Sequence, residues 1–191
     1  MYIFFLTLYY DTQMKPLHIS GLVFLGDSAT GKDLRKLPSP SSLISSFQGK
    51  EDVKWAVISV GGGKQRAPPA SVSYLHLGIL DTSSSSSDAI MLRTITDAVT
   101  FGTEQLATGR ALLIHCRGGI RRSPTVAAAV VAAAEGMSVD EAMALVKRAR
   151  PAANPRSEFV AALRTWEVLR DSDAGQGNVG TGNPCQRRHF Y

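Results

Sequence analysis

The segment from Ala111 to Gly136 constrains the fold more than any other part of the chain. It begins with an apolar run, ALLIH, continues through a short loop with two glycines, CRGGIRR, and passes into SPTVAAAVVAAAEG, which is almost continuously apolar. The first run is typical of a strand buried on both faces. The last is typical of a buried helix with Pro124 in its first turn and Gly136 at its end. The segment therefore predicts a buried strand, a tight loop and a central helix in succession.

Other strands and helices alternate around this unit. Apolar or alternating runs predict strands at Leu22–Leu25, Trp55–Val60 and Ser73–Leu77, and a helical turn is expected at Asp33–Leu37. Helical spacing predicts helices over Ala89–Leu106 with Asp88 as N-cap, over Val139–Ala149 behind a capping box of Ser138 and Glu141, and over Ser157–Leu169. The Pro38–Ser46 cluster and the five serines after Asp81 are expected to be loops. This order predicts an α/β fold with a mostly parallel central sheet flanked by helices.

The length of 191 residues suits one ordinary domain. We expect an extension over residues 1–18, the folded domain over residues 19–170 and a disordered tail over residues 171–191, where apolar periodicity disappears. The apolar first ten residues have no basic start and are too short to span a bilayer. We interpret them as an extension or an added edge strand and expect no stable membrane insertion.

The charge and the cysteines narrow the class of partner. The formal net charge is +5, but the basic residues form short clusters instead of one long tract, which favours a phosphorylated or otherwise anionic substrate over nucleic acid. The two cysteines, Cys116 and Cys185, are expected to be free thiols in a reducing compartment, and Cys185 a bystander in the tail. The histidines have no ligand-like spacing, so we expect no metal and no cofactor.

The loop between the predicted strand and helix has the composition of an anion site. Its backbone N–H groups can point inward at the start of a helix, where the helix dipole adds attraction, and Gly118 and Gly119 permit the tight backbone that this requires. Cys116 lies at the lip of this cradle, where partial positive charge favours the thiolate, which is the reactive nucleophile. Arg122 can then bind two phosphate oxygens at once. The candidate phosphate-binding residues are Arg117, Gly118, Gly119, Ile120, Arg121 and Arg122.

These residues resemble the signature of the protein tyrosine phosphatase superfamily, in which His-Cys is followed by five residues, Arg, and Ser or Thr. The spacing of Cys116, Gly119, Arg122 and Ser123 is similar to that of the dual-specificity branch. The resemblance extends to Tyr74–Leu77 with Leu80-Asp81, to the helix after Asp88, and to Arg150-Pro151 with Asn154-Pro155, and so covers about residues 19–169.

The resemblance implies a role for each matching residue. Cys116 would attack phosphorus and become a phosphocysteine, Arg122 would hold the equatorial oxygens, and Ser123 would hydrogen-bond the sulfur and ease its departure. His115 would orient and tune the thiolate from behind, and Asn154 would steady the loops around the site. The chain would then be a dual-specificity protein phosphatase that hydrolyses phosphotyrosine and phosphoserine or phosphothreonine. We expect it in the cytoplasm, with the nucleus as the alternative.

Several alternatives stay open on the sequence alone. The general acid that the resemblance implies matches Asp81, but Asp88 is the alternative, although it is better used as a helix cap. Arg117 and Arg121 are either solvated charges or a positive rim for multiply anionic substrates. The substrate is expected to be a phosphoprotein, such as a protein kinase. A phosphoinositide and a catalytically inactive phosphoprotein-binding module are the alternatives.

A second motif, from Gly26 to Lys32, has the glycine and lysine spacing of a nucleotide-binding loop after an apolar strand. Asp33 stands where such a loop needs a hydroxyl for magnesium. We therefore predict a turn into a short helix at this place.

Overall fold

The computed structural model describes residues 16–44, 53–61, 68–79 and 88–176. Within these ranges a five-stranded sheet has the order β1-β2-β5-β3-β4. The strands are β1 (Leu17–Ser20), β2 (Val23–Gly26), β3 (Trp55–Val60), β4 (Ser73–Leu77) and β5 (Ala111–His115). β1 pairs with β2 antiparallel, and the other pairs are parallel. The predicted mostly parallel sheet is confirmed.

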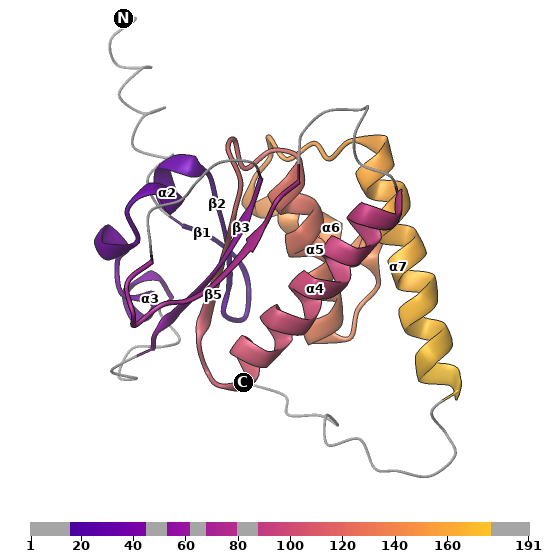
Figure 1. The fold of residues 1–191 in the computed structure, drawn as a ribbon, viewed down its shortest axis with the longest axis horizontal. Helices are drawn as coiled ribbons and strands as arrows, with labels where there is room; N and C mark the ends of the chain where they lie inside the picture. Colours follow the sequence, from indigo (N-terminus) through magenta and orange to yellow (C-terminus); the bar gives the residue numbers. More distant parts are fainter. Residues whose placement is uncertain (1–15, 45–52, 62–67, 80–87, 177–191) are drawn as a thin grey trace, which may run out of the picture.

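Helices cover both faces of the sheet (Figure 1). The longer helices lie on one face and the short ones on the other. The first group is α4 (Asp88–Ala107), α5 (Arg122–Glu135), α6 (Val139–Ala149) and α7 (Ser157–Gln176), and the second is α2 (Ser28–Lys32), the 3-10 turn η1 (Leu34–Lys36) and α3 (Pro40–Leu43). Every residue of β3 and β5 is therefore buried, as their uninterrupted apolar runs predict.

Alternate residues of each central strand supply the two cores. Leu112 and Ile114 of β5 pack towards the longer helices, whereas Ala111 and Leu113 pack with Trp55 and Phe24 on the opposite face. His115 follows Leu113 in this alternation, so its side chain faces the short helices. The last residue of β5 then delivers Cys116 to the carboxyl edge of the sheet, beside the ends of β2 and β3.

Most predicted boundaries are confirmed within a residue or two. β3, β4, β5 and α6 have the predicted bounds, and the Ser138–Glu141 capping box is present. α5 ends at Gly136, whose φ of 67° is the left-handed geometry that glycine adopts without strain. The motif at Gly26–Lys32 is the turn and short helix that were predicted, and the Asp27 side chain caps it.

Four boundaries differ from the predictions. Pro40–Leu43 is a helical turn inside the predicted loop, since Ser39-Pro40 is a favourable helix start. β1 begins at Leu17, within the predicted extension, because it pairs with β2. α4 begins at Asp88, one residue before the predicted Ala89. α7 continues past Leu169 to Gln176, so the first six residues of the predicted disordered tail are helical.

The extension of α7 has a visible cause. The Arg170 guanidinium lies 5.1 Å from the centre of the Trp166 ring and donates a hydrogen bond to the Met137 carbonyl at 3.2 Å. These contacts hold the helix against the turn between α5 and α6 beyond the last apolar residue. The serine loop, residues 1–15 and residues 177–191 lie outside the described residues.

In the described ranges, no helix has the length and apolar character needed to cross a membrane.

Candidate active site

The loop from Cys116 to Arg122 turns its carbonyl groups outward. Three of them accept hydrogen bonds from outside the loop: Arg117 from the Ser28 N–H at 3.1 Å, Gly118 from Arg150 Nη2 at 2.8 Å, and Ile120 from the Asn154 N–H at 2.7 Å. Successive peptide groups whose carbonyls point out present their N–H groups to the inside. The loop therefore has the arrangement of an anion cradle at the start of α5.

Cys116 lies at the base of this cradle and is 4% exposed. Its Sγ accepts hydrogen bonds from the Gly119 N–H at 3.2 Å and from the Ser123 hydroxyl at 3.2 Å. Burial raises the pKa of the thiol, but the hydrogen bonds from Ser123 and Gly119 and the charge of Arg122 lower it by more. The net pKa of Cys116 is below its ordinary value, which favours the thiolate.

Arg122 is the first residue of α5, and its side chain is buried. Nη1 donates a hydrogen bond to the Ile79 carbonyl at 2.9 Å, while the buried Nε has no hydrogen-bond partner among the described residues. One edge of the guanidinium is thus attached to the protein. A second edge keeps a donor for an anion in the cradle, which is the arrangement that bidentate phosphate binding requires.

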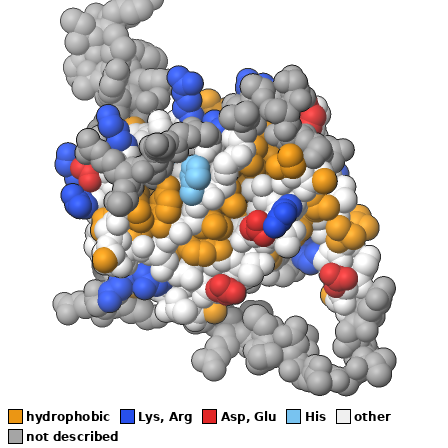
Figure 2. All heavy atoms as spheres, in the orientation of Figure 1, with side chains coloured by type: hydrophobic (Ala, Val, Ile, Leu, Met, Phe, Trp, Pro, Cys, Tyr) orange, Lys and Arg blue, Asp and Glu red, His pale blue; other side chains and the backbone are white. Residues whose placement is uncertain are grey.

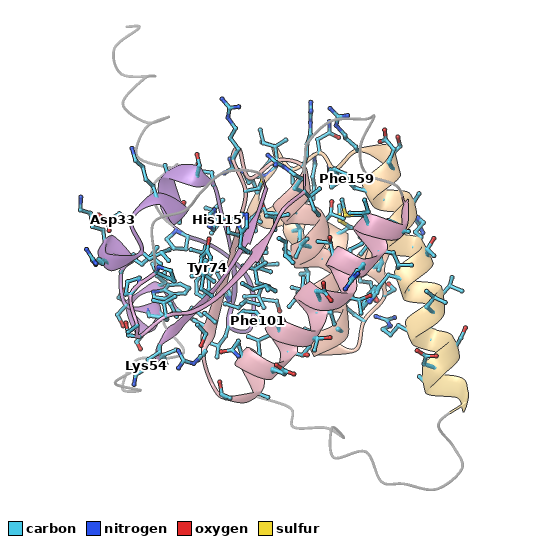
Figure 3. The ribbon with its side chains drawn as sticks, in the orientation of Figure 1. Asp33, Lys54, Tyr74, Phe101, His115 and Phe159 are labelled. Atoms are coloured by element: carbon cyan, nitrogen blue, oxygen red, sulfur yellow. The ribbon has the colours of Figure 1, made fainter. Side chains whose placement is uncertain are left out.

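His115 is buried beneath α2, next to Cys116 in the chain (Figure 3). A Cβ atom on Gly31 of α2 would lie 2.2 Å from the ring carbon Cε1, so the helix and the ring are in direct contact. Burial lowers the pKa of His115 from 6.5 to about 4, although the nearby Asp27 carboxylate acts in the opposite direction. The imidazole is therefore neutral at physiological pH and adds no charge to the site.

Two backbone features fix the shape and position of the loop. Gly119 has a φ of 61°, and a Cβ atom there would lie 2.9 Å from the Gly26 carbonyl oxygen, so only glycine fits. Asn154 is exposed, and its contact with the loop is the backbone N–H bond to Ile120. The supporting role of Asn154 stays a prediction, and the contact that the structure shows is made by the main chain.

The rim of the cradle is basic. Arg117, Ile120 and Arg121 are exposed, whereas Gly119 and Arg122 are buried. Lys and Arg side chains also gather at the left edge of the face in Figure 2, over α2 and η1, where Lys32, Arg35 and Lys36 are exposed. Because the first N–H of α2 is bonded to the Arg117 carbonyl, this basic surface adjoins the loop.

Three candidate residues of the sequence analysis are not placed with the site. Asp81 and Cys185 lie outside the described residues, so the structure does not test their predicted roles. For Asp88 the backbone is described at the first residue of α4, but the side chain is not. The choice between Asp81 and Asp88 as general acid stays a prediction.

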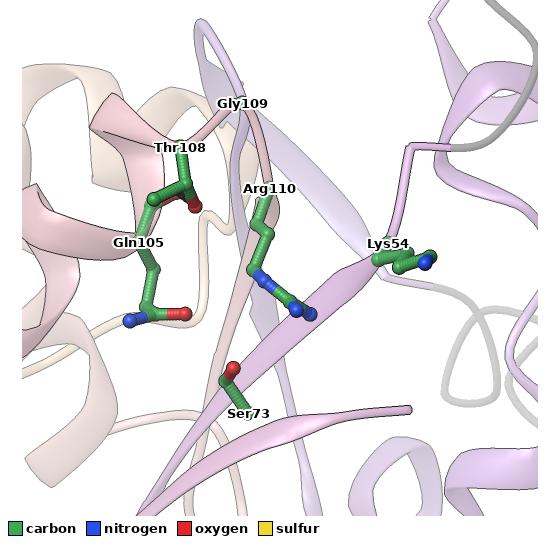
Figure 4. A pocket seen from close by; sticks show the side chains of 6 residues that line it. All are labelled: Lys54, Ser73, Gln105, Thr108, Gly109 and Arg110. Atoms are coloured by element: carbon green, nitrogen blue, oxygen red, sulfur yellow. Dashed lines mark hydrogen bonds between the residues drawn. The ribbon is translucent and has the colours of Figure 1, made fainter. Parts of the chain in front are cut away.

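A hollow away from the cysteine loop is the other candidate site in the described ranges. These ranges contain no group of three or more His, Cys, Asp or Glu side chains arranged to hold a metal ion. An open hollow of about 480 Å³ lies at the amino ends of β3, β4 and β5, lined by Lys54, Ser73, Gln105, Thr108, Gly109 and Arg110 (Figure 4). The Arg110 side chain there donates to the carbonyls of Trp55 and Ser71. Cys116 follows the carboxyl end of β5, so this hollow is not part of the cysteine site.

Comparison with known proteins agrees with this geometry. The family model described as "Dual specificity phosphatase, catalytic domain" matches residues 50–168, which include the whole loop. The chain belongs to this family. The predicted resemblance to the dual-specificity branch is therefore confirmed.

Curated relatives carry the same description. The chain is 25% identical over 119 residues to mouse dual specificity protein phosphatase 19, an alignment that covers 62% of this chain and 52% of the relative. It is 39% identical over 71 residues to human dual specificity protein phosphatase 8, covering 37% of this chain and 11% of the relative. The chain thus spans about half or less of the length of these relatives.

Solved structures of phosphatase-like proteins share the fold. Human DUSP28 has a TM-score of 0.62 at 20% identity, with 82% of this chain and 95% of that chain covered. The human tyrosine phosphatase-like serine/threonine/tyrosine-interacting protein has a TM-score of 0.65 at 22% identity, covering 82% and 98%. At this identity the likeness establishes the fold and no more.

Four residues that contact the candidate site were not predicted from the sequence. They are Gly31 against His115, the Ile79 carbonyl that accepts from Arg122, Gly61 beside that guanidinium, and Arg150, which bonds to Gly118. Gly61 could have been suspected, because a glycine directly after a buried parallel strand lies at the edge where ligands bind. A backbone carbonyl such as that of Ile79 has no signal in the sequence.

Proposed function

We propose that this chain is a dual-specificity protein phosphatase that hydrolyses phosphotyrosine and phosphoserine or phosphothreonine through a phosphocysteine intermediate. The observation that most supports this proposal is the pair of hydrogen bonds to Cys116 Sγ, at 3.2 Å each, inside a loop whose carbonyls point outward. A sulfur held in this way is an ionised nucleophile next to a site for the phosphate that it attacks.

The first step forms the bond from sulfur to phosphorus. The Cys116 thiolate attacks the phosphorus atom, and the bond from phosphorus to the substrate oxygen breaks. The electron pair stays on the departing oxygen, which takes a proton from the general acid. Arg122 and the inward N–H groups of the loop hold the non-bridging oxygens, and their interaction strengthens as charge develops in the transition state.

The second step regenerates the enzyme. A water molecule attacks phosphorus and gives a proton to the group that acted as acid, and the bond from sulfur to phosphorus breaks. The electron pair returns to Cys116 as a thiolate, and inorganic phosphate is released. Ser123 would stabilise the departing sulfur, because its hydroxyl already donates to Sγ at 3.2 Å.

We assign the general acid to Asp81, with Asp88 as the alternative. If Asp81 has this role, Asp81→Ala slows the hydrolysis of a substrate with a poor leaving group by about 100-fold or more at acidic pH. The effect on a substrate with a good leaving group is smaller, because that group needs less protonation. Asp88→Ala is the matched variant. An unchanged rate for Asp81→Ala together with a slow Asp88→Ala would transfer the role to Asp88.

Turnover of p-nitrophenyl phosphate in the presence of EDTA tests whether the chain is an enzyme. We expect steady release of p-nitrophenol by the natural chain and none above background by Cys116→Ser. Equal rates for the two would contradict the proposed function and favour the catalytically inactive phosphoprotein-binding module.

The proposed substrate is a phosphoprotein, such as a protein kinase, in the cytoplasm or nucleus. The exposed Arg117 and Arg121 beside the cradle support an anionic substrate, and a phosphoinositide would also meet this requirement. A panel of phosphopeptides and phosphoinositides separates them. A kcat/KM that is highest for the lipids would contradict the proposed protein substrate.

A further inference from the structure

Gly61 lies where β3 ends and directly contacts the side chain of Arg122. A Cβ atom built on Gly61 would lie 2.5 Å from Arg122 Nη1, 3.2 Å from Cζ and 3.6 Å from Nη2. The first distance is much shorter than a van der Waals contact, so no side chain fits between the strand end and the guanidinium while Arg122 keeps its place. Because the distance from this Cβ position is shortest to Nη1 and longest to Nη2, the Nη1 edge of the guanidinium faces the strand end.

The backbone of Gly61 is fixed at this place. Its N–H donates a hydrogen bond to the Leu77 carbonyl of β4 at 2.8 Å, and its φ is 146°. That angle is one that residues with a Cβ atom seldom adopt. The strand end therefore brings an α carbon to the guanidinium in a conformation that glycine permits.

A second contact lies on the same edge of the guanidinium. Nη1 donates to the Ile79 carbonyl at 2.9 Å, and Ile79 follows β4, the strand that pairs with β3. Gly61 and Ile79 together enclose Nη1, while the buried Nε has no partner among the described residues. The enclosed edge sets the direction in which the other edge presents its donors.

We propose that Gly61 is a positioning residue for the phosphate site: by lacking a side chain, it lets the ends of β3 and β4 hold the Nη1 edge of Arg122 so that the Nε edge faces the cradle. The role deepens the proposed function and rests on it for its effect on turnover. Gly61 touches neither the substrate nor the reacting atoms, and it acts through Arg122.

The substitution Gly61→Ala separates this role from a role in folding. The atom that obstructs the new methyl group is the end of a flexible side chain, so the steric conflict is relieved if the guanidinium moves aside; the backbone strain at a φ of 146° is separate and is the same with or without the Arg122 side chain. We expect kcat/KM for p-nitrophenyl phosphate to fall by about 100-fold, as when a donor to the transition state is lost. Gly109→Ala is the control, because Gly109 also has a positive φ, 78°, but no atom within 4 Å of its Cβ position. We expect this control to keep kcat/KM within about twofold.

Phosphate binding can be measured without turnover. Inorganic phosphate in the cradle protects Cys116 from alkylation by iodoacetamide, and the phosphate concentration that halves the alkylation rate reports its affinity. We expect Gly61→Ala to raise that concentration by at least about tenfold, the effect of losing a hydrogen bond to a charged group. If the natural chain shows this protection but does not turn over p-nitrophenyl phosphate, the proposed function fails and the positioning role survives.

The decisive comparison uses a chain without the guanidinium. In an Arg122→Ala background, adding Gly61→Ala should change the half-protecting phosphate concentration by less than about twofold, because there is nothing left to displace. If Gly61→Ala weakens phosphate binding equally in both backgrounds, or leaves it unchanged in the natural chain, the inference is wrong. If Gly61→Ala alone does not fold, the melting temperature of the double variant Gly61→Ala, Arg122→Ala decides. A double variant that folds supports the contact between Gly61 and the guanidinium, and a double variant that stays unfolded overturns the inference.

Discussion

Removing the Ser123 hydroxyl should raise the pKa of Cys116, because the thiolate loses a hydrogen-bond donor. Ser123 is fully buried at the start of α5, and its hydroxyl donates to Sγ at 3.2 Å. Burial is the largest influence on the pKa of this thiol and raises it, and the Ser123 hydroxyl makes the largest opposing contribution. A hydrogen bond to a charged group is worth about 1.5–3 kcal/mol, so its loss should destabilise the thiolate relative to the thiol by about that amount.

The rate of alkylation of Cys116 by iodoacetamide, measured against pH, reports this pKa directly because the thiolate reacts. In Ser123→Ala the rising limb of the profile should move to higher pH, so that less thiolate is present at neutral pH. The second step should also slow. A burst of p-nitrophenol from the first turnover would then persist while the steady rate falls.

Ser138→Ala is the matched control for Ser123→Ala. Ser138 loses a hydroxyl that caps α6, at a cost of about 1 kcal/mol, but lies outside the site. We expect the alkylation profile of Ser138→Ala to match that of the natural chain. A profile for Ser123→Ala that shifts by less than about 0.3 unit would show that Ser123 does not stabilise the thiolate, and would refute this use of the geometry.

Three further outcomes are expected. Gly31→Ala should lower the free energy of unfolding in urea by about 1–3 kcal/mol, because its methyl group meets the His115 ring, whereas Gly78→Ala, with no atom within 4 Å of its Cβ position, should not show this loss. The pKa of His115 is about 4 in the fold and 6.5 in the unfolded chain, so the unfolded chain takes up a proton first as the pH falls. The free energy of unfolding should therefore drop by about 3 kcal/mol between pH 6.5 and pH 4 because of this residue. In His115→Gln, the drop over the same pH range should be smaller by about 3 kcal/mol. Hydrogen peroxide should inactivate the enzyme reversibly and more slowly with phosphate present, and insensitivity would contradict a reactive thiolate at Cys116.

The strand, loop and helix around Cys116 were predictable because each is specified locally. β5 is an uninterrupted apolar run, α5 begins at Arg122 with Pro124 in its first turn, and both bounds follow from neighbouring residues. The Ser138 capping box predicted α6 for the same reason. Patterns of this kind require no knowledge of what packs against the segment.

The end of α7 was not predictable on this basis. Residues after Leu169 are polar, and their composition is that of a tail. The helix continues because Arg170 packs on Trp166 and reaches the Met137 carbonyl, 33 residues away. β1 was missed for a related reason, since four residues form a strand there only by pairing with β2.

The central position of β5 explains why one short loop meets so many parts of the chain. β5 lies between β2 and β3. The loop after β5 therefore lies next to the segment that follows β2 and the segment that follows β3. After β2, Ser28 bonds to Arg117 and Gly31 covers His115, and after β3, Gly61 adjoins Arg122. These partners lie 61 to 89 residues along the chain from the residues they touch, and the parallel sheet brings them to one edge. The signature residues therefore identify the chemistry locally, but the orientation of the phosphate-binding arginine depends on strand order, which the sequence alone does not reveal.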